Sequence, residues 1–167
     1  MSVIYLIGFM GTGKTTVGTE LAKQLHYSFY DSDQRVVERT GKSITELFEE
    51  LGEDGFRKLE QEALQSLPIE KGIIATGGGI ILKEENRLYM KKTGYVIWLD
   101  ASPEEIGKRL ESDSSRPLLS RDKTNQIKQL YYSRVDLYNH AADSRIVTDG
   151  KTVDEIIKEI LTKTIKV

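Results

Sequence analysis

The chain has 167 residues, with 24 lysines and arginines against 26 aspartates and glutamates, and no cysteine. This length fits one domain of ordinary size, and the lack of cysteine excludes disulfides, thiolate nucleophiles and cysteine-based metal sites, so we expect a reducing, cytoplasmic setting. The net charge of -2 offers no broad basic field for DNA or RNA, and no apolar run reaches the about 20 residues of a membrane-spanning helix; we therefore expect neither nucleic acid nor a membrane as partner.

The first half of the chain alternates short apolar runs with segments of helical periodicity. Residues Val3–Ile7 form a continuous apolar, β-branched run, which is typical of a strand buried on both faces of a parallel sheet. A glycine-rich turn follows, and from Lys14 the apolar residues recur at helical spacing. Next we expect a short strand over residues 28–30, two short helices that Gly41 and Gly52 end, and a further helix that Pro68 stops.

The second half of the chain continues the alternation. We expect, in order, a strand over residues 72–76, a run of three glycines, a helix over residues 84–92, a strand over 95–99, a helix over 103–110 with Ser102 as N-cap, a polar loop over 112–122, a helix through Tyr138, a strand over 145–148 and a last helix from Thr152. This order predicts a three-layer α/β/α domain around a mainly parallel sheet of about five strands.

Residues 8–15, GFMGTGKT, match the phosphate-binding P-loop pattern G-x-x-x-x-G-K-S/T in full, between the strand and the helix that the motif requires. The glycines let backbone N–H groups turn around phosphate oxygens, and the helix N-terminus adds partial positive charge. Lys14 can reach the β- and γ-phosphates, and the Thr15 hydroxyl can hold Mg²⁺. The alternatives are a glycine-rich turn without a ligand and an inactive remnant of a nucleotide site.

Two further groups follow predicted strands, on the side of an open α/β sheet where ligands bind. In an extended segment Asp31 and Asp33 would point the same way, so that one could order water around Mg²⁺ and the other could accept a proton from an acceptor hydroxyl. As an alternative, Asp33 is the N-cap of the following helix. The glycine run 77–79 lets backbone approach a small ligand closely, although a tight turn also explains it.

Arginines complete the set of candidate site residues. Arg57 and Arg134 could each fork onto a carboxylate of a substrate. Arg116, in the polar loop, is placed like a lid arginine that closes over a transferring phosphate. The alternative for each of them is a solvated or salt-bridged surface residue.

Together these segments resemble the shikimate kinase family over nearly the whole chain. The resemblance is carried by the P-loop with its extension to Gly18, by Asp31-Ser32-Asp33, Gly41-Lys42-Ser43-Ile44, Gly52-Glu53, Phe56-Arg57, Glu60, Gly77-Gly78-Gly79, Arg116-Pro117-Leu118-Leu119, Arg134 and Leu137-Tyr138. It implies a P-loop NTPase of the nucleoside-monophosphate-kinase fold with parallel strand order 2-3-1-4-5. It also implies one kinase domain over residues 1–167, with substrate-binding helices at about 33–62 and a mobile lid at about 112–122.

The activity that the resemblance implies is transfer of the γ-phosphoryl group of ATP, with Mg²⁺, to the 3-hydroxyl of shikimate in aromatic amino acid biosynthesis. By the same resemblance, shikimate is bound by Asp33, Arg57, Gly78, Gly79 and Arg134, and ATP by Gly11, Thr12, Gly13, Lys14, Thr15, Thr16, Arg109 and Arg116. The catalytic residues are then Lys14, Asp33 and Arg116, with Asp33 as the base. Thr15 holds the metal directly, and Asp31 holds it through water.

Three rival functions remain open at this point. Another P-loop small-molecule kinase, such as a gluconate or nucleoside monophosphate kinase, would share the P-loop but not the acceptor-side segments. A nucleotide-dependent switch such as a small GTPase would carry a guanine-reading Asn-Lys-x-Asp segment, which the sequence lacks. An inactive scaffold would have no need of Lys14, Thr15, Asp31 and Asp33 together. We expect a monomer, since no heptad repeat or apolar surface stripe demands a partner.

Overall fold

The structure is a computed structural model and describes residues 3–112 and 123–164. Its elements, in chain order, are β1 (Val3–Ile7), α1 (Lys14–Leu25), β2 (Ser28–Asp31), α2 (Ser32–Thr40), α3 (Ile44–Gln65), β3 (Gly72–Ala75), the 3₁₀ helix η1 (Ile80–Leu82), α4 (Glu84–Thr93), β4 (Tyr95–Asp100), α5 (Pro103–Glu111), α6 (Lys123–Ala141), β5 (Ser144–Val147) and α7 (Val153–Thr164). Strands and helices follow one another in the predicted order, and the 3₁₀ helix η1 is an element that the sequence did not indicate.

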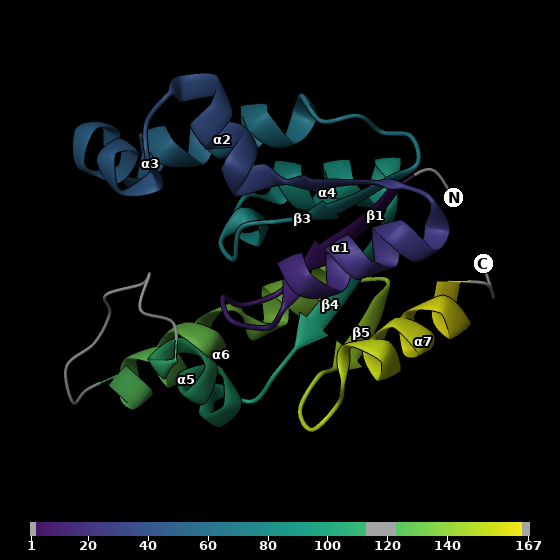
Figure 1. Ribbon diagram of the computed structural model, residues 1–167. Coiled ribbons are helices and arrows are strands. Elements are labelled where there is room, and N and C mark those ends of the chain that lie inside the picture. Colours follow the sequence, from purple (N-terminus) through teal and green to yellow (C-terminus); the bar gives the residue numbers. More distant parts are fainter. Residues whose placement is uncertain (1–2, 113–122, 165–167) are drawn as a thin grey trace.

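The sheet confirms the predicted topology. Among the described residues it has five strands in the order β2-β3-β1-β4-β5, and every neighbouring pair is parallel. Helices cover both faces, and Figure 1 shows α1 and α7 side by side on one of them. The three-layer α/β/α architecture is therefore the one that the alternation of strands and helices predicts.

The side chains of a strand point alternately to the two faces of the sheet, so the core has one part on each face. On one face, Val3, Tyr5 and Ile7 of β1 pack with residues of α3, α4 and α6. On the other face, Ile4 and Leu6 pack with residues of α1 and α7. Because β1 is buried on both faces, its sequence is a continuous apolar run rather than an alternating one.

Strand register brings the candidate site residues to one edge of the sheet. Leu6, near the end of β1, is paired with Ala75, the last residue of β3, and Ala75 is paired with Asp31, the last residue of β2. The P-loop follows β1 and the glycine run follows β3. Since all these strands are parallel, their carboxyl ends lie together, which is where an open α/β sheet binds its ligands.

The helical region 32–65 is interrupted at the two glycines that the sequence indicates. Gly41, with φ 69°, follows the end of α2 as expected. Gly52 also has φ 69°, but it makes a kink inside α3, which resumes at once and continues to Gln65. Glycine takes the left-handed φ without stopping the residues after it from returning to helix. The helical conformation is thus interrupted at Gly52, as predicted, and α3 consists of two helical segments joined there.

Serine side chains cap the N-termini of α3 and α5. The Ser102 hydroxyl accepts a hydrogen bond of 3.2 Å from the Glu105 N–H at the start of α5, as predicted. Ser43 and Glu46 form a capping box at the start of α3.

No helix in the ranges 3–112 and 123–164 is long and apolar enough to cross a membrane.

Candidate active site

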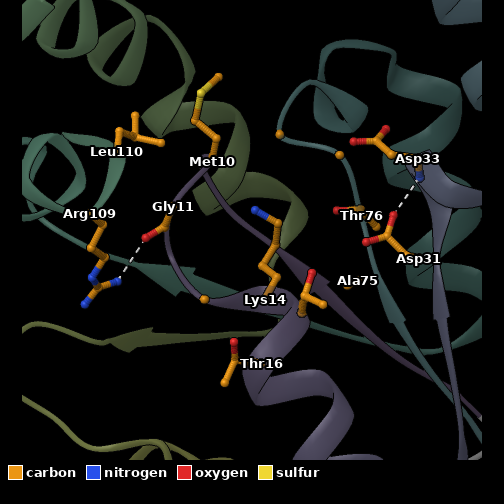
Figure 2. A pocket seen from close by; sticks show the side chains of 14 residues that line it. Met10, Gly11, Lys14, Thr16, Asp31, Asp33, Ala75, Thr76, Arg109 and Leu110 are labelled. Carbon is orange, nitrogen blue, oxygen red and sulfur yellow. Dashed lines mark hydrogen bonds between the residues drawn. The ribbon is translucent and has the colours of Figure 1, made fainter. Parts of the chain in front are cut away.

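The P-loop forms one wall of a cavity of about 220 Å³. Gly11 and Gly13 have φ of 78° and 85°, a conformation that favours glycine, and α1 begins directly after Gly13. The Lys14 amine donates hydrogen bonds of 2.8 and 2.9 Å to the carbonyls of Gly8 and Phe9. Figure 2 shows that this amine lies inside the cavity, between the P-loop and the aspartates. The arrangement presents a cation and a helix N-terminus to one small volume, which suits a phosphate chain.

The cavity walls include most of the predicted nucleotide contacts. The residues that line the cavity are Met10, Gly11, Gly13, Lys14, Thr15, Thr16, Asp31, Asp33, Ala75, Thr76, Gly77, Gly78, Arg109 and Leu110. Thr12 is not among them: its side chain is buried and donates a hydrogen bond of 2.9 Å to the Phe9 carbonyl. The Thr12 side chain therefore braces the loop from within, and only its backbone remains for a phosphate.

Arg109 joins three parts of the fold at the rim of this cavity. Its guanidinium donates to the Gly11 carbonyl at 3.1 Å, as Figure 2 shows, and to the Thr148 hydroxyl at 3.4 Å. A third hydrogen bond of 3.2 Å joins it to Glu105, one turn earlier on α5. The planar guanidinium is thereby fixed beside the P-loop, where a flat ring can stack on it.

Asp31 and Asp33 have different structural roles, which corrects the prediction. β2 extends to Asp31, whose Oδ1 accepts hydrogen bonds of 2.9 Å from the Asp33 N–H and 3.1 Å from the Gln34 N–H. Asp31 is therefore the N-cap of α2, and Asp33 lies in the first turn of that helix. The two carboxylates do not share one extended segment, because the chain turns into helix directly after Asp31. Both still line the cavity of the P-loop.

A second cavity, of about 360 Å³, adjoins the first. Its walls are Met10, Asp33, Ile44, Phe48, Glu53, Phe56, Arg57, Glu60, Gly77, Gly78, Gly79 and Arg134. The two cavities share Met10, Asp33, Gly77 and Gly78, so Asp33 faces both. One cavity combines a lysine with the backbone of the P-loop, and the other combines two arginines with three carboxylates and apolar side chains.

Arg57 is held on several sides in the second cavity. Its guanidinium donates hydrogen bonds of 3.0 and 3.2 Å to Glu60 and lies over the rings of Phe48 and Phe56, 5.8 and 5.3 Å from their centroids. Its side chain is only 12% exposed. The Nε atom is buried without a hydrogen-bond partner in the described residues. An incoming carboxylate would meet a guanidinium whose position is already fixed.

Glu60 is the partner of Arg57 and was not predicted as such. Its side chain is buried, and burial raises the pKa of this carboxyl, with the charge of Arg57 acting in the opposite direction. The sequence does contain a signal, since the two residues are three apart on one helix and thus lie on one face. What it lacks is any indication that this face is buried.

The three consecutive glycines make room for side chains of the site. A Cβ on Gly79 would lie 2.5 Å from Nη2 of Arg57, and one on Gly77 would lie 2.6 Å from Oδ1 of Asp33. Neither distance is possible for real atoms. The glycine run was predicted to allow the approach of a ligand; the structure shows that it also allows the approach of Arg57 and Asp33.

Comparison with known proteins gives the family. A family model described as shikimate kinase matches residues 10–165. The chain belongs to the shikimate kinase family. It is 42% identical over 163 residues to a shikimate kinase of Bacillus anthracis, with 98% of each chain covered.

Solved structures of the family have the same fold. The chain is similar to shikimate kinase from Acinetobacter baumannii in complex with shikimate, with a TM-score of 0.92 and 36% identity over 99% of this chain and 94% of that one. For shikimate kinase from Aquifex aeolicus the TM-score is 0.84 and the identity 40%, over 97% of this chain and 95% of that one. The family resemblance drawn from the motifs and the strand order 2-3-1-4-5 are both confirmed.

Within this shikimate kinase fold, the predicted site residues divide into two groups. The structure gathers those of the P-loop, except Thr12, with Asp31 and Arg109 around the first cavity, and Arg57, Gly79 and Arg134 around the second, while Asp33 and Gly78 line both. Arg116 and the predicted lid from residue 113 onward lie outside the described residues. Their roles stay predictions.

The residues present fit a magnesium ion that is held together with a nucleotide. The described part of the chain has no group of three or more histidine, cysteine, aspartate or glutamate side chains that could hold a metal by themselves. Mg²⁺ in kinases is ordinarily bound through one or two side chains, several waters and the phosphates of the substrate. Thr15 and Asp31 line the same cavity and provide a hydroxyl and a carboxylate for that purpose.

Proposed function

We propose that this chain transfers the γ-phosphoryl group of ATP to the 3-hydroxyl of shikimate, giving shikimate 3-phosphate and ADP, in aromatic amino acid biosynthesis. The observation that carries the proposal is the pair of adjoining cavities with Asp33 in the wall of both. Phosphoryl transfer needs a donor and an acceptor held in line with little covalent work by the protein. Full-length similarity to shikimate kinases supports the choice of shikimate among P-loop kinase acceptors.

The nucleotide is proposed to occupy the first cavity. Backbone N–H groups of residues 11–16 bind its phosphates at the start of α1, and the Lys14 ammonium neutralises charge on the γ-phosphoryl oxygens. Arg109 packs its guanidinium plane on the adenine. Arg116 is proposed to add positive charge from the lid, as its place in the family motif suggests.

Thr15 and Asp31 are proposed to hold Mg²⁺, which would offset the negative charge of the nucleotide phosphates. The Thr15 hydroxyl binds it directly. Asp31 acts through water, because its Oδ1 already accepts the two N–H groups of the α2 cap and leaves Oδ2 for an outer contact. The cap also fixes the direction of this carboxylate, so it needs no reordering when the nucleotide binds.

Shikimate is proposed to occupy the second cavity. Arg57 and Arg134 bind its carboxylate, and the apolar side chains of the cavity face its ring. The backbone of Gly78 and Gly79 contacts its hydroxyl groups. Asp33 accepts the proton of the attacking hydroxyl, since it is the carboxylate that faces both cavities.

The remaining proposals concern the protein as a whole. We propose a single kinase domain that acts as a monomer in the cytoplasm, with residues 33–62 on the acceptor side and residues 112–122 as a lid. The lack of cysteine supports the compartment. No partner other than ATP and shikimate is proposed.

A coupled assay of ADP release tests the proposal. The purified chain is supplied with MgATP and, separately, with shikimate, gluconate and AMP. We expect turnover with shikimate and only background turnover with the other two. A preference for gluconate or AMP, or ADP release that does not depend on shikimate, would contradict it. An acceptor-dependent signal that chelation of Mg²⁺ leaves unchanged would contradict the proposed metal requirement.

A further inference from the structure

The glycine loop, residues 77–79, is tied to the rest of the protein at two points. On one side the Gly77 N–H donates a hydrogen bond of 3.1 Å to the Ser32 hydroxyl, 45 residues away in sequence. On the other side the Tyr138 hydroxyl donates a short hydrogen bond to the Gly78 carbonyl, 60 residues away. Both contacts bind backbone of the loop, so they constrain its path whatever side chains line the cavity.

Ser32 connects the loop to the helix that carries Asp33. Ser32 is fully buried and is the first residue of α2, between Asp31 and Asp33. Its neighbours line the cavities, while its own hydroxyl turns to the glycine loop. A shift of Gly77 relative to Ser32 is therefore a shift relative to Asp33, whose Oδ1 leaves no room for a Cβ on Gly77.

Tyr138 connects the loop to the helix that carries Arg134. The two residues are four apart on α6 and so lie one above the other on one helix face. The Tyr138 ring is fully buried and stacks on Trp98 of β4, with 5.7 Å between centroids and 18° between planes. This stack leaves the ring little freedom to turn away from Gly78.

The Tyr138 hydroxyl keeps its proton under all ordinary conditions. Burial raises its pKa to about 12, and the positive charges of Arg134 and Arg57 lower it only in part. The hydroxyl is thus a permanent donor to the Gly78 carbonyl, and the hydrogen bond does not switch on or off with pH.

We propose that Ser32 and Tyr138 are positioning residues for the phosphoryl acceptor, acting through the glycine loop. This inference rests on the proposed function. The glycines of the loop have no side chains that could reorient toward the acceptor, so the contacts of the loop depend on where its backbone lies. The two hydrogen bonds fix this backbone between Asp33 on α2 and Arg134 on α6. Loss of either one lets the loop move, so the acceptor binds less well and its hydroxyl lies less often in line with the γ-phosphoryl group.

Two variants each remove one of these hydrogen bonds. Tyr138→Phe keeps the ring and its stack on Trp98 and deletes only the hydroxyl, with its hydrogen bonds to Gly78 and to the Arg134 side chain. Ser32→Ala deletes the other partner of the loop. For each, we expect KM for shikimate to rise and kcat to fall, so that kcat/KM for shikimate drops about tenfold, while KM for ATP keeps its wild-type value.

Tyr5→Phe is the matched control. Tyr5 is also fully buried, in the same core cluster, and its hydroxyl shares a hydrogen bond of 2.7 Å with Thr93, the last residue of α4. Like Tyr138→Phe, the Tyr5→Phe variant loses a buried tyrosine hydroxyl and its hydrogen bond, but this hydroxyl does not contact the glycine loop. We expect its melting temperature to fall like that of Tyr138→Phe, with both KM values and kcat unchanged.

The outcomes separate this inference from the function on which it rests. If the wild-type chain does not phosphorylate shikimate, the proposed function fails before any variant is measured. If the wild type is active and Tyr138→Phe behaves like Tyr5→Phe, losing only thermal stability, Tyr138 is a structural residue and the inference is overturned. Should Tyr138→Phe not fold, Ser32→Ala decides in its place: an unchanged KM for shikimate there overturns the inference as well.

Discussion

Gly79→Ala tests whether the glycine loop sets the position of Arg57. Gly79 has φ -93° and ψ 4°, which alanine adopts without strain, so any effect comes from the added methyl group. That methyl carbon would lie 2.5 Å from Nη2 and 2.6 Å from Cζ of Arg57, whereas ordinary contacts begin at 3.4 Å. Either the loop or the guanidinium must move by on the order of 1 Å.

The size of the expected rise in KM for shikimate depends on the contacts that hold Arg57 in place. Glu60 and the stacked rings of Phe48 and Phe56 fix the guanidinium, so it can withdraw only by giving up some of these contacts. A displacement of this size would remove the alignment of one charge-assisted hydrogen bond from Arg57 to the carboxylate of shikimate, as proposed above, worth about 1.5–3 kcal/mol. We therefore expect KM for shikimate to rise roughly 10- to 150-fold, with KM for ATP unchanged.

Steady-state kinetics with each substrate varied at saturating levels of the other measures both constants. Gly107→Ala, in the middle of α5, is the control, since a Cβ there meets nothing within 4 Å. It should leave both KM values unchanged and, as a helix interior, gain up to about 1 kcal/mol in stability. An unchanged KM for shikimate in Gly79→Ala would refute the steric argument, and an equal rise in both KM values would point to general damage to the fold.

Four further predictions follow from the site and the caps. Asp33→Asn should lower kcat far more than it weakens ATP binding; an equal loss of ATP binding would contradict its role as base. Arg57→Ala should raise KM for shikimate and not for ATP, and the reverse pattern would remove Arg57 from the acceptor site. Ser102→Ala should cost about 1 kcal/mol in urea unfolding through loss of the α5 cap, and an unshifted midpoint would show that the cap contributes nothing. Because burial raises the pKa of Glu60 above its ordinary 4.5, the folded state holds this proton more tightly than the unfolded chain. Its contribution to stability is thus greatest below pH 4.5 and falls as pH rises through the raised value. Glu60→Gln should remove that slope in urea titrations at increasing pH; equal slopes in both proteins would rule out Glu60 as its source.

The features that could be predicted from sequence are those in which a local pattern fixes local structure. The P-loop motif, the buried strand before it and the helix after it are all contiguous, and parallel topology then places every strand end at one edge of the sheet. Asp31, Asp33 and the glycine loop follow predicted strands or strand ends. Their gathering around the first cavity could therefore be expected without knowledge of the tertiary packing.

The features that could not be predicted depend on small backbone choices or on distant contacts. Asp31 rather than Asp33 caps α2 because the helix begins at Ser32, directly after β2 and earlier than the sequence indicates. The bond between Tyr138 and Gly78 spans 60 residues and has no local signal at all.

The relation between Arg57 and Glu60 explains how a largely buried arginine is kept in the proposed acceptor site. A guanidinium that is only 12% exposed is costly unless an opposite charge accompanies it, and Glu60 provides that charge on the same helix. Because Glu60 occupies Nη1, the guanidinium keeps its orientation when the cavity has no acceptor. The carboxylate of the acceptor then binds a cation whose desolvation the fold has already compensated, so less of its binding free energy is lost to ordering Arg57. A chain of balanced composition can therefore hold two arginines in this cavity, because carboxylates of the same cavity, Glu60 above all, accompany them.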